Sequence, residues 1–177
     1  MSVRPPVAAQ GAAAADRVHR FESRSETETE RLGAAFAAAF RADPGRAVRV
    51  GLSGDLGAGK TTWVRGLLRR LGATGAIRSP TYSLIERHVL ADGLEVVHGD
   101  LYRLESPEAL LALALDDVDR GGTLWLIEWP EQGGEMLPAA DLALQLVVEG
   151  AVHRIAASAG SELGAAWLAR LDTPGHA

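Results

Sequence analysis

The chain has 177 residues and a formal net charge of −5, from 23 acidic and 18 basic residues, and 47% of its residues are hydrophobic. This composition is typical of one compact domain with a buried core, and the chain is too short for two large domains. The acidic balance excludes a broad positive field, so unaided binding along a nucleic-acid backbone is not expected. Because the chain has no cysteine, disulfides, thiolate zinc sites and cysteine nucleophiles are excluded.

The sequence predicts neither a membrane span nor a targeting segment. The longest strictly apolar run, residues 109–115, is far shorter than the ~20 residues that cross a bilayer. Proline and glycine interrupt the alanine-rich residues 1–16, so no apolar signal segment forms there. We expect residues 1–16 to be a disordered extension, residues 17–171 to form a single domain and residues 172–177 to be a tail. The absence of a signal favours a cytoplasmic protein.

Apolar periodicity predicts strands and helices in alternation. Ser25 and Glu28 form a capping box at the start of a helix that Asp-Pro-Gly at 43–45 ends. A second helix follows Gly59 and stops at Gly72. The predicted strands, in chain order, are 18–22, 46–52, 82–90, 94–98, 123–129, 142–148 and 152–157. Further helices are expected from Glu108 to about Leu115 and from Ser161 to Leu171.

Two of these strand pairs are joined by short loops that contain glycine. The pairs are 82–90 with 94–98 and 142–148 with 152–157, and each is predicted to be an antiparallel hairpin. The remaining strands alternate with helices, as they do in parallel sheets. We therefore expect a three-layer α/β fold whose mixed sheet is parallel at its centre.

Residues 54–61 read Gly-Asp-Leu-Gly-Ala-Gly-Lys-Thr and match the phosphate-loop pattern G-x-x-x-x-G-K-[ST]. They lie between a predicted strand and a predicted helix, which is the context that a P-loop NTPase fold requires. Backbone N–H groups would surround a phosphate, Lys60 would reach the β- and γ-phosphates of ATP, and the Thr61 hydroxyl would bind Mg²⁺. The residues expected to bind the nucleotide are Asp55, Leu56, Gly57, Ala58, Gly59, Lys60, Thr61 and Thr62.

Lys60 is the only lysine, since the other 17 basic residues are arginine. In a sequence so biased toward arginine, a single lysine indicates a position where arginine cannot replace it, but chance could also leave one lysine anywhere, so its neighbours decide. The compact ammonium group fits a tight phosphate loop, whereas the wide, rigid guanidinium group does not.

Two acids that close predicted strands, Asp100 and Glu128, are candidates for a catalytic and Mg²⁺-binding role. The carboxyl ends of parallel strands gather beside the phosphate loop, so we expect both carboxylates to converge there. Glu128 is the better match to an acid on a central strand, and the alternative for either residue is a turn or cap carboxylate. His98 is interpreted as a structural, hydrogen-bonded imidazole and Arg103 as an ion-pair partner.

Other residues around the predicted site allow more than one interpretation. Ser79 and Thr81 lie where P-loop proteins place a switch segment, although a capped proline loop explains them nearly as well. Arg65 and Arg69 are four residues apart, which is typical of a solvated helix face or of a contact for a partner. Trp129 is interpreted first as core filling, and then as a nucleotide wall or a partner anchor.

Four motifs together resemble, in order, the bacterial TsaE (YjeE) family, over about residues 18–158. They are residues 54–62, residues 79–82, His-Gly-Asp-Leu-Tyr-Arg-Leu at 98–104 and Ile-Glu-Trp-Pro-Glu at 127–131. The resemblance implies a small P-loop ATPase required for threonylcarbamoylation of adenosine 37 in tRNA. Its ATP hydrolysis would support turnover of a TsaD and TsaB transferase complex. The protein would contact tRNA only through that complex.

By the same resemblance Lys60 and Thr61 bind phosphate and Mg²⁺, and Asp100 and Glu128 are the functional acids. Tyr82 stands where the family usually has phenylalanine. The main alternative is a small P-loop kinase that phosphorylates a metabolite, although no segment between Ala73 and Gly122 is typical of a lid. A regulatory GTPase is excluded, because the motif that recognises guanine, Asn/Thr-Lys-x-Asp, needs a lysine and the chain has no lysine outside the phosphate loop and no asparagine. A module that binds nucleotide without hydrolysis is disfavoured, because Lys60 and Thr61 are intact and two acids end predicted strands.

Overall fold

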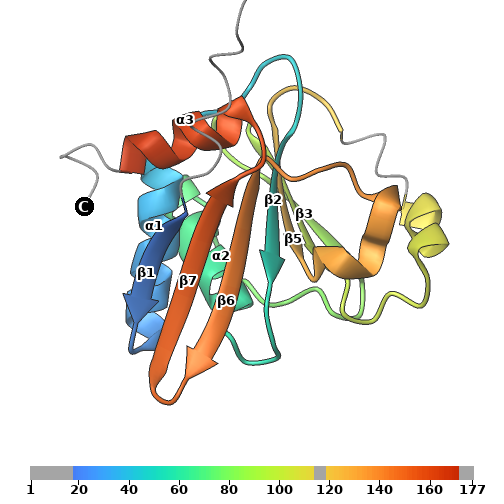
Figure 1. Ribbon diagram of the computed structural model, residues 1–177. Coiled ribbons are helices and arrows are strands. Elements are labelled where there is room, and N and C mark those ends of the chain that lie inside the picture. Colours follow the sequence, from blue (N-terminus) through green and yellow to red (C-terminus); the bar gives the residue numbers. More distant parts are fainter. Residues whose placement is uncertain (1–17, 114–118, 172–177) are drawn as a thin grey trace, which may run out of the picture.

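The structure is a computed structural model that describes residues 18–113 and 119–171 (Figure 1). The predicted N-terminal extension, the C-terminal tail and the end of the helix expected at 108–115 lie outside the described residues. The strands are β1 His19–Ser23, β2 Val48–Ser53, β3 Ile85–Val89, β4 Glu95–Asp100, β5 Thr123–Glu128, β6 Leu142–Glu149 and β7 Val152–Ala159. The α-helices are α1 Glu26–Ala39, α2 Lys60–Leu71 and α3 Glu162–Leu171, and two 3-10 helices are η1 Pro107–Leu113 and η3 Pro130–Met136.

The seven strands form one mixed sheet in the order β1-β7-β6-β2-β5-β4-β3. The four central strands, β6, β2, β5 and β4, pair in parallel. The two predicted hairpins, β3 with β4 and β6 with β7, are antiparallel, and β1 adds an antiparallel edge strand to β7. The prediction of a mixed sheet with a parallel centre is therefore confirmed.

Two segments differ from the expected elements. β3 begins at Ile85 rather than at residue 82, because Leu84 has a positive φ of 61° that breaks the extended conformation. The helix expected after Ser106 is the 3-10 helix η1, which reaches Leu113 within the described residues.

The core is divided by the sheet. The three α-helices lie on one face of the sheet (Figure 1). Their apolar sides pack against the strands, and Phe36, Trp63 and Trp167 are almost fully buried there. On the other face a smaller cluster, with Trp125 at its centre, packs under η1 and η3. Trp63, Trp125 and Trp167 thus fill the core.

The ends of the first two helices follow their sequence signals. The Ser25 hydroxyl accepts a hydrogen bond from the backbone N–H of Glu28 at 3.2 Å, and the Glu28 carboxylate accepts one from the N–H of Arg24 at 2.6 Å. α2 ends at Gly72, whose φ of 103° is the left-handed conformation that glycine adopts without strain.

A pair of glycines brings α1 and α2 into backbone contact. A Cβ atom on Gly33 would lie 2.1 Å from the carbonyl oxygen of Trp63, and one on Gly66 would lie 2.0 Å from that of Glu30. Beside this contact Arg65 donates to Glu30 at 2.6 Å, and Arg69 donates to the same carboxylate. The two arginines therefore form a network between the helices rather than a free face.

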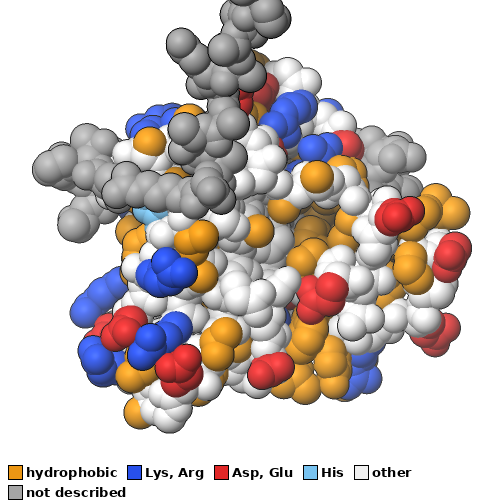
Figure 2. Space-filling model, viewed as in Figure 1, with side chains coloured by type: hydrophobic (Ala, Val, Ile, Leu, Met, Phe, Trp, Pro, Cys, Tyr) orange, Lys and Arg blue, Asp and Glu red, His pale blue; other side chains and the backbone are white. Residues whose placement is uncertain are grey.

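The surface carries charges of both signs close together. Figure 2 shows basic and acidic side chains interspersed over the lower ends of β1 and β7, where Arg154 pairs with Glu149 at 3.0 Å. No continuous basic patch covers the described residues on the face in that view. Within the described residues, every helix is too short or too polar to cross a bilayer.

We predict that Gly66→Ala destabilises the protein by about 1–3 kcal/mol, because the added methyl group would force α1 and α2 apart. In a free helix the same change would gain roughly 1 kcal/mol. Urea unfolding measures the difference, and Arg70→Ala on the exposed face of α2 is the control, expected within about 0.5 kcal/mol of the unchanged protein. A stabilised Gly66→Ala protein would contradict the close helix packing.

Candidate functional site

The parallel register of the central strands places three strand ends side by side. Glu128, the last residue of β5, pairs with Leu52 of β2 on one side and with Asp100 of β4 on the other. The glycine-rich loop follows β2 directly and leads into α2. The two predicted acids and the loop therefore meet at one edge of the sheet, as expected for the carboxyl ends of parallel strands.

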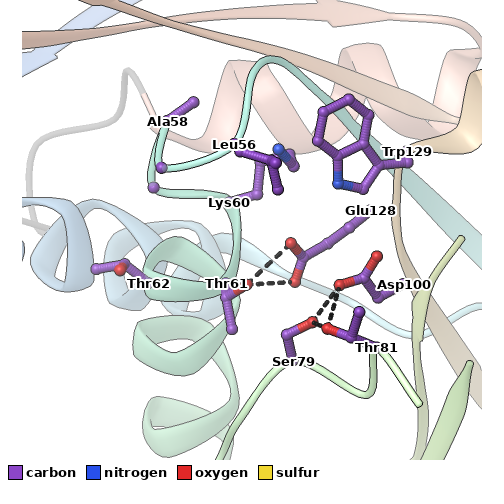
Figure 3. Close-up of a pocket in the computed structure, with 12 residues that line it drawn as sticks. Leu56, Ala58, Lys60, Thr61, Thr62, Ser79, Thr81, Asp100, Glu128 and Trp129 are labelled. Carbon is purple, nitrogen blue, oxygen red and sulfur yellow. Dashed lines mark hydrogen bonds between the residues drawn. The ribbon is translucent and has the colours of Figure 1, made fainter. Parts of the chain in front are cut away.

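A cavity of about 270 Å³ opens at this edge (Figure 3). The residues that line it are Leu56, Gly57, Ala58, Gly59, Lys60, Thr61, Thr62, Ser79, Thr81, Asp100, Glu128 and Trp129. Every predicted site residue is in this set except Asp55, whose side chain is exposed and whose carbonyl oxygen bonds to Lys60. The four segments singled out in the sequence thus surround a single cavity.

The loop has the backbone conformation of a phosphate cradle at its glycines. Gly54, Gly57 and Gly59 have φ values of 137°, 79° and 100°, which other residues rarely adopt. Gly54 also needs the absence of a side chain, because a Cβ atom there would lie 2.1 Å from the carbonyl oxygen of Leu146. β6 therefore fixes where the loop leaves β2.

Lys60 begins α2 and is only 5% exposed. Its Nζ donates to the carbonyl oxygens of Gly54 at 2.6 Å and Asp55 at 2.9 Å, so the side chain folds back along the loop. Burial lowers the pKa of the ammonium group, even though nearby carboxylates, led by that of Glu128, act to raise it. The lysine is thus a desolvated cation at the mouth of the cradle.

Glu128 links the loop helix to the sheet. Both oxygens of its carboxylate accept from the Thr61 hydroxyl, at 2.9 Å each, and Oε1 also lies 2.9 Å from Nε2 of His98. The carboxylate is 2% exposed and His98 is fully buried, so the imidazole holds Glu128 in place. This confirms that His98 is a hydrogen-bonded imidazole.

Asp100 holds the segment that contains Ser79 and Thr81 (Figure 3). One carboxylate oxygen accepts from the Ser79 hydroxyl and, at 3.1 Å, from the Thr81 hydroxyl. The other accepts from the backbone N–H of Tyr102 at 3.0 Å. The candidate switch residues are therefore fastened to one of the two acids, which sequence spacing alone does not reveal.

Trp129 lines the cavity and also packs, partly buried, against the smaller core cluster, so the first interpretation as core filling holds only in part. The residue is half-buried and has a positive φ of 58°, which turns its ring back over the loop. The Lys60 Nζ lies 3.9 Å from the ring centroid, a cation–π contact, and the ring of Tyr102 lies 5.0 Å away. The sequence around Trp129 does not predict this positive φ, because a tryptophan rarely adopts it.

Two further residues, His153 and Arg103, are placed in ways that the sequence did not indicate. His153, at the start of β7, lies with Nδ1 3.0 Å from the carbonyl oxygen of Ala58 and so supports the loop from outside the motif. Thr62 lies across the first turn of α2 from Glu128 (Figure 3). Arg103, expected to form an ion pair, instead lies over the exposed ring of Tyr82, with 4.9 Å from Cζ to the centroid.

The charges and donor atoms of the cavity fit a divalent cation of the Mg²⁺ type. Among the described residues that line it, Lys60 is the only basic side chain and Asp100 and Glu128 are the acidic ones. Two carboxylates outweigh one ammonium group, so a polyphosphate would be repelled unless a cation came with it. The oxygen atoms of the carboxylates and of the Thr61 hydroxyl are the ligands that Mg²⁺ prefers.

Comparison with known proteins identifies the family. A family model described as threonylcarbamoyl adenosine biosynthesis protein TsaE matches residues 23–156. The chain belongs to the TsaE family. Among its relatives is the tRNA threonylcarbamoyladenosine biosynthesis protein TsaE of Haemophilus influenzae, 45% identical over 101 residues, 57% of this chain and 63% of that protein. The match therefore spans slightly less than two thirds of that relative.

A second TsaE relative, from Rickettsia bellii, is 37% identical over 123 residues, which are 69% of this chain and 81% of that protein. Among solved structures, the crystal structure of YdiB from Bacillus subtilis superposes with a TM-score of 0.66 at 27% identity. The superposition covers 88% of this chain and 94% of YdiB. The predicted family and the P-loop NTPase-like fold are confirmed.

We predict that Lys60→Ala lowers the ATP hydrolysis expected from the sequence on the order of 10³-fold or more and leaves the fold intact, because Lys60 is the only basic side chain among the described residues that line the cavity. Steady-state phosphate release measures the rate, and thermal unfolding checks the fold. Arg70→Ala, which changes an exposed residue of the same helix, is expected to keep the full rate. Near-normal turnover by a folded Lys60→Ala protein would remove Lys60 from the mechanism.

Proposed function

We propose that this protein binds ATP with Mg²⁺, hydrolyses it, and acts in threonylcarbamoylation of adenosine 37 in tRNA by supporting turnover of a TsaD and TsaB transferase complex. The observation that carries the nucleotide part is the convergence of Lys60, Thr61, Asp100 and Glu128 on one cavity beside a phosphate loop. Membership of the TsaE family supports the role in tRNA modification.

The residues of the loop would bind and orient the triphosphate. The backbone N–H groups at the start of α2 would donate to the phosphate oxygens, and the positive end of the helix dipole would attract the same negative charge. Lys60 would leave the carbonyl oxygens of Gly54 and Asp55 and place its ammonium group on the phosphates. The Mg²⁺ ion, held by Thr61 and one or both acids, would neutralise the charge that develops on the transferred phosphoryl group.

Glu128 and Asp100 would have different tasks because their contacts differ. Glu128 already bonds to the Thr61 hydroxyl, so it is the acid best placed to share the cation with that residue. Asp100 is bonded to the hydroxyls of Ser79 and Thr81. A nucleotide that drew Asp100 toward its cation would therefore pull on residues 79–81, which makes this segment the proposed switch.

Hydrolysis by the isolated protein should be slow. P-loop enzymes gain about 10³–10⁵-fold in rate from an arginine that reaches the transferring phosphoryl group, supplied by the same chain or by a partner. Among the described residues that line the cavity there is no arginine, and Arg78, next to the switch segment, is exposed. We infer that a partner protein completes the site, and TsaD and TsaB are the proposed partners.

We predict that TsaD and TsaB together stimulate the ATPase rate by at least about tenfold, because a partner supplies what this cavity lacks. Phosphate release is measured for the protein alone, with both partners, and with candidate metabolites. Thr81→Val, which removes one hydroxyl from Asp100 and keeps the side-chain shape, is expected to reduce the stimulation more than the basal rate.

A fast basal rate would contradict the need for a partner. Stimulation only by a metabolite that becomes phosphorylated would replace the proposal with the alternative, a small P-loop kinase.

A further inference from the structure

Two histidines and a glutamate of the β3–β4 hairpin lie together outside the nucleotide cavity. Glu86 is directly opposite His98 in the antiparallel register, and His88 lies two residues along β3 on the same face. One ring nitrogen of each histidine and one carboxylate oxygen of Glu86 lie within 4.8 Å of one another. The sheet register therefore gathers two imidazoles and a carboxylate on a rigid hairpin.

The two imidazoles have buried nitrogens without partners. Nδ1 of His98 and Nε2 of His88 are buried and accept or donate no hydrogen bond among the described residues. The His98 side chain is fully buried, and its Nε2 is already taken by Glu128, so Nδ1 is the nitrogen left to bind a ligand. A buried polar atom without a partner costs about 1–3 kcal/mol, so two side by side point to a ligand that satisfies both.

We propose that Glu86, His88 and His98 form a second metal site, for a divalent transition-metal ion such as Zn²⁺. Two imidazole nitrogens and one carboxylate oxygen are a ligand set that Zn²⁺ takes readily, with a fourth position left for water. Mg²⁺ prefers oxygen ligands, so this site and the nucleotide cavity select different ions. The proposal does not depend on the proposed function.

The second bond of His98 supports this assignment. A histidine that binds a metal through one ring nitrogen usually donates its other N–H to a carboxylate, which fixes the tautomer and the ring orientation. His98 is arranged in this way, with Nε2 2.9 Å from Oε1 of Glu128. With a metal on Nδ1, the proton stays on Nε2 and His98 becomes a fixed donor to Glu128.

The position of His88 also suits metal binding. An imidazole binds a metal ion through a ring nitrogen, and Nε2 of His88 is buried with no hydrogen-bond partner among the described residues. Glu86 is exposed and closes the open side of the group with a negative charge.

The site would couple a metal ion to the nucleotide cavity through one side chain. His98 is a positioning residue for Glu128, and Glu128 in turn bonds to Thr61. Metal on His98 should therefore hold Glu128 toward Thr61 without entering the cavity. We expect Zn²⁺ at the hairpin to change how tightly Mg²⁺ and nucleotide bind, although its ligands lie outside the cavity.

The test is direct metal binding to the full, tag-free chain. Calorimetric titration with Zn²⁺ is done in excess Mg²⁺, which occupies the oxygen ligands of the nucleotide cavity. We expect one Zn²⁺ per chain and a loss of at least about tenfold in affinity in His88→Ala. His19→Ala, which removes a histidine from β1 at the opposite edge of the sheet, is the matched control and should bind as the unchanged protein does.

A second variant and a second metal ion separate loss of the site from misfolding. Glu86→Gln changes an exposed residue, so it should weaken Zn²⁺ binding while the fold is kept. Co²⁺ bound in the site should show the visible absorption of an ion with nitrogen ligands, and His88→Ala should abolish this absorption. Absence of Zn²⁺ binding in the unchanged protein would overturn the proposal. If Glu86→Gln and His88→Ala both bound Zn²⁺ as tightly as the unchanged protein does, the proposal would also be overturned, because the ion would then bind elsewhere.

Discussion

The parallel register of β2, β5 and β4 is the constraint on which the rest of the site depends. It aligns Leu52, Glu128 and Asp100 at one level, so the loop that follows β2 begins beside two carboxylates. A shift of one residue in β5 would turn Glu128 to the opposite face of the sheet and away from Thr61. The burial of Leu124 and Leu126 against the α-helices resists such a shift, because these side chains share the face of Glu128.

The helix layer fixes the other half of the site. Gly33 and Gly66 let α1 and α2 touch through their backbones, which sets the distance of α2 from the sheet and hence the position of Lys60 and Thr61. Gly54 against β6 and His153 against Ala58 fix the loop itself. The result is a cavity with two carboxylates and one desolvated ammonium group, an arrangement that favours a cation together with an anionic ligand.

Much of this site could be predicted from the sequence because its signals are local. The phosphate-loop pattern, the capping box at Ser25 and the glycine stop at Gly72 each depend on a few neighbouring residues, and the structure has all three. The convergence of Asp100 and Glu128 followed from a general property of parallel sheets rather than from their spacing. The division into strands was also clear, since both hairpins have short loops with glycine.

What could not be predicted depends on backbone conformation and on distant partners. Trp129 has a positive φ and lines the cavity as well as packing against the smaller core cluster, and the positive φ of Leu84 delays the start of β3. The hydrogen bonds of Asp100 to Ser79 and Thr81 join residues that are about 20 apart in the chain, and His153 meets Ala58 from another strand. Such contacts are set by the tertiary structure and have no local signature.

The central claim is that Glu128 makes this phosphate site depend on a divalent cation. The most direct measurement is the affinity for ADP with and without Mg²⁺, by calorimetry, in the unchanged protein and in Glu128→Gln. We expect Mg²⁺ to tighten ADP binding at least about tenfold in the unchanged protein and to have little effect in Glu128→Gln, whose affinity without Mg²⁺ should be equal or higher because one negative charge is gone. An equal effect of Mg²⁺ in both proteins would contradict the account.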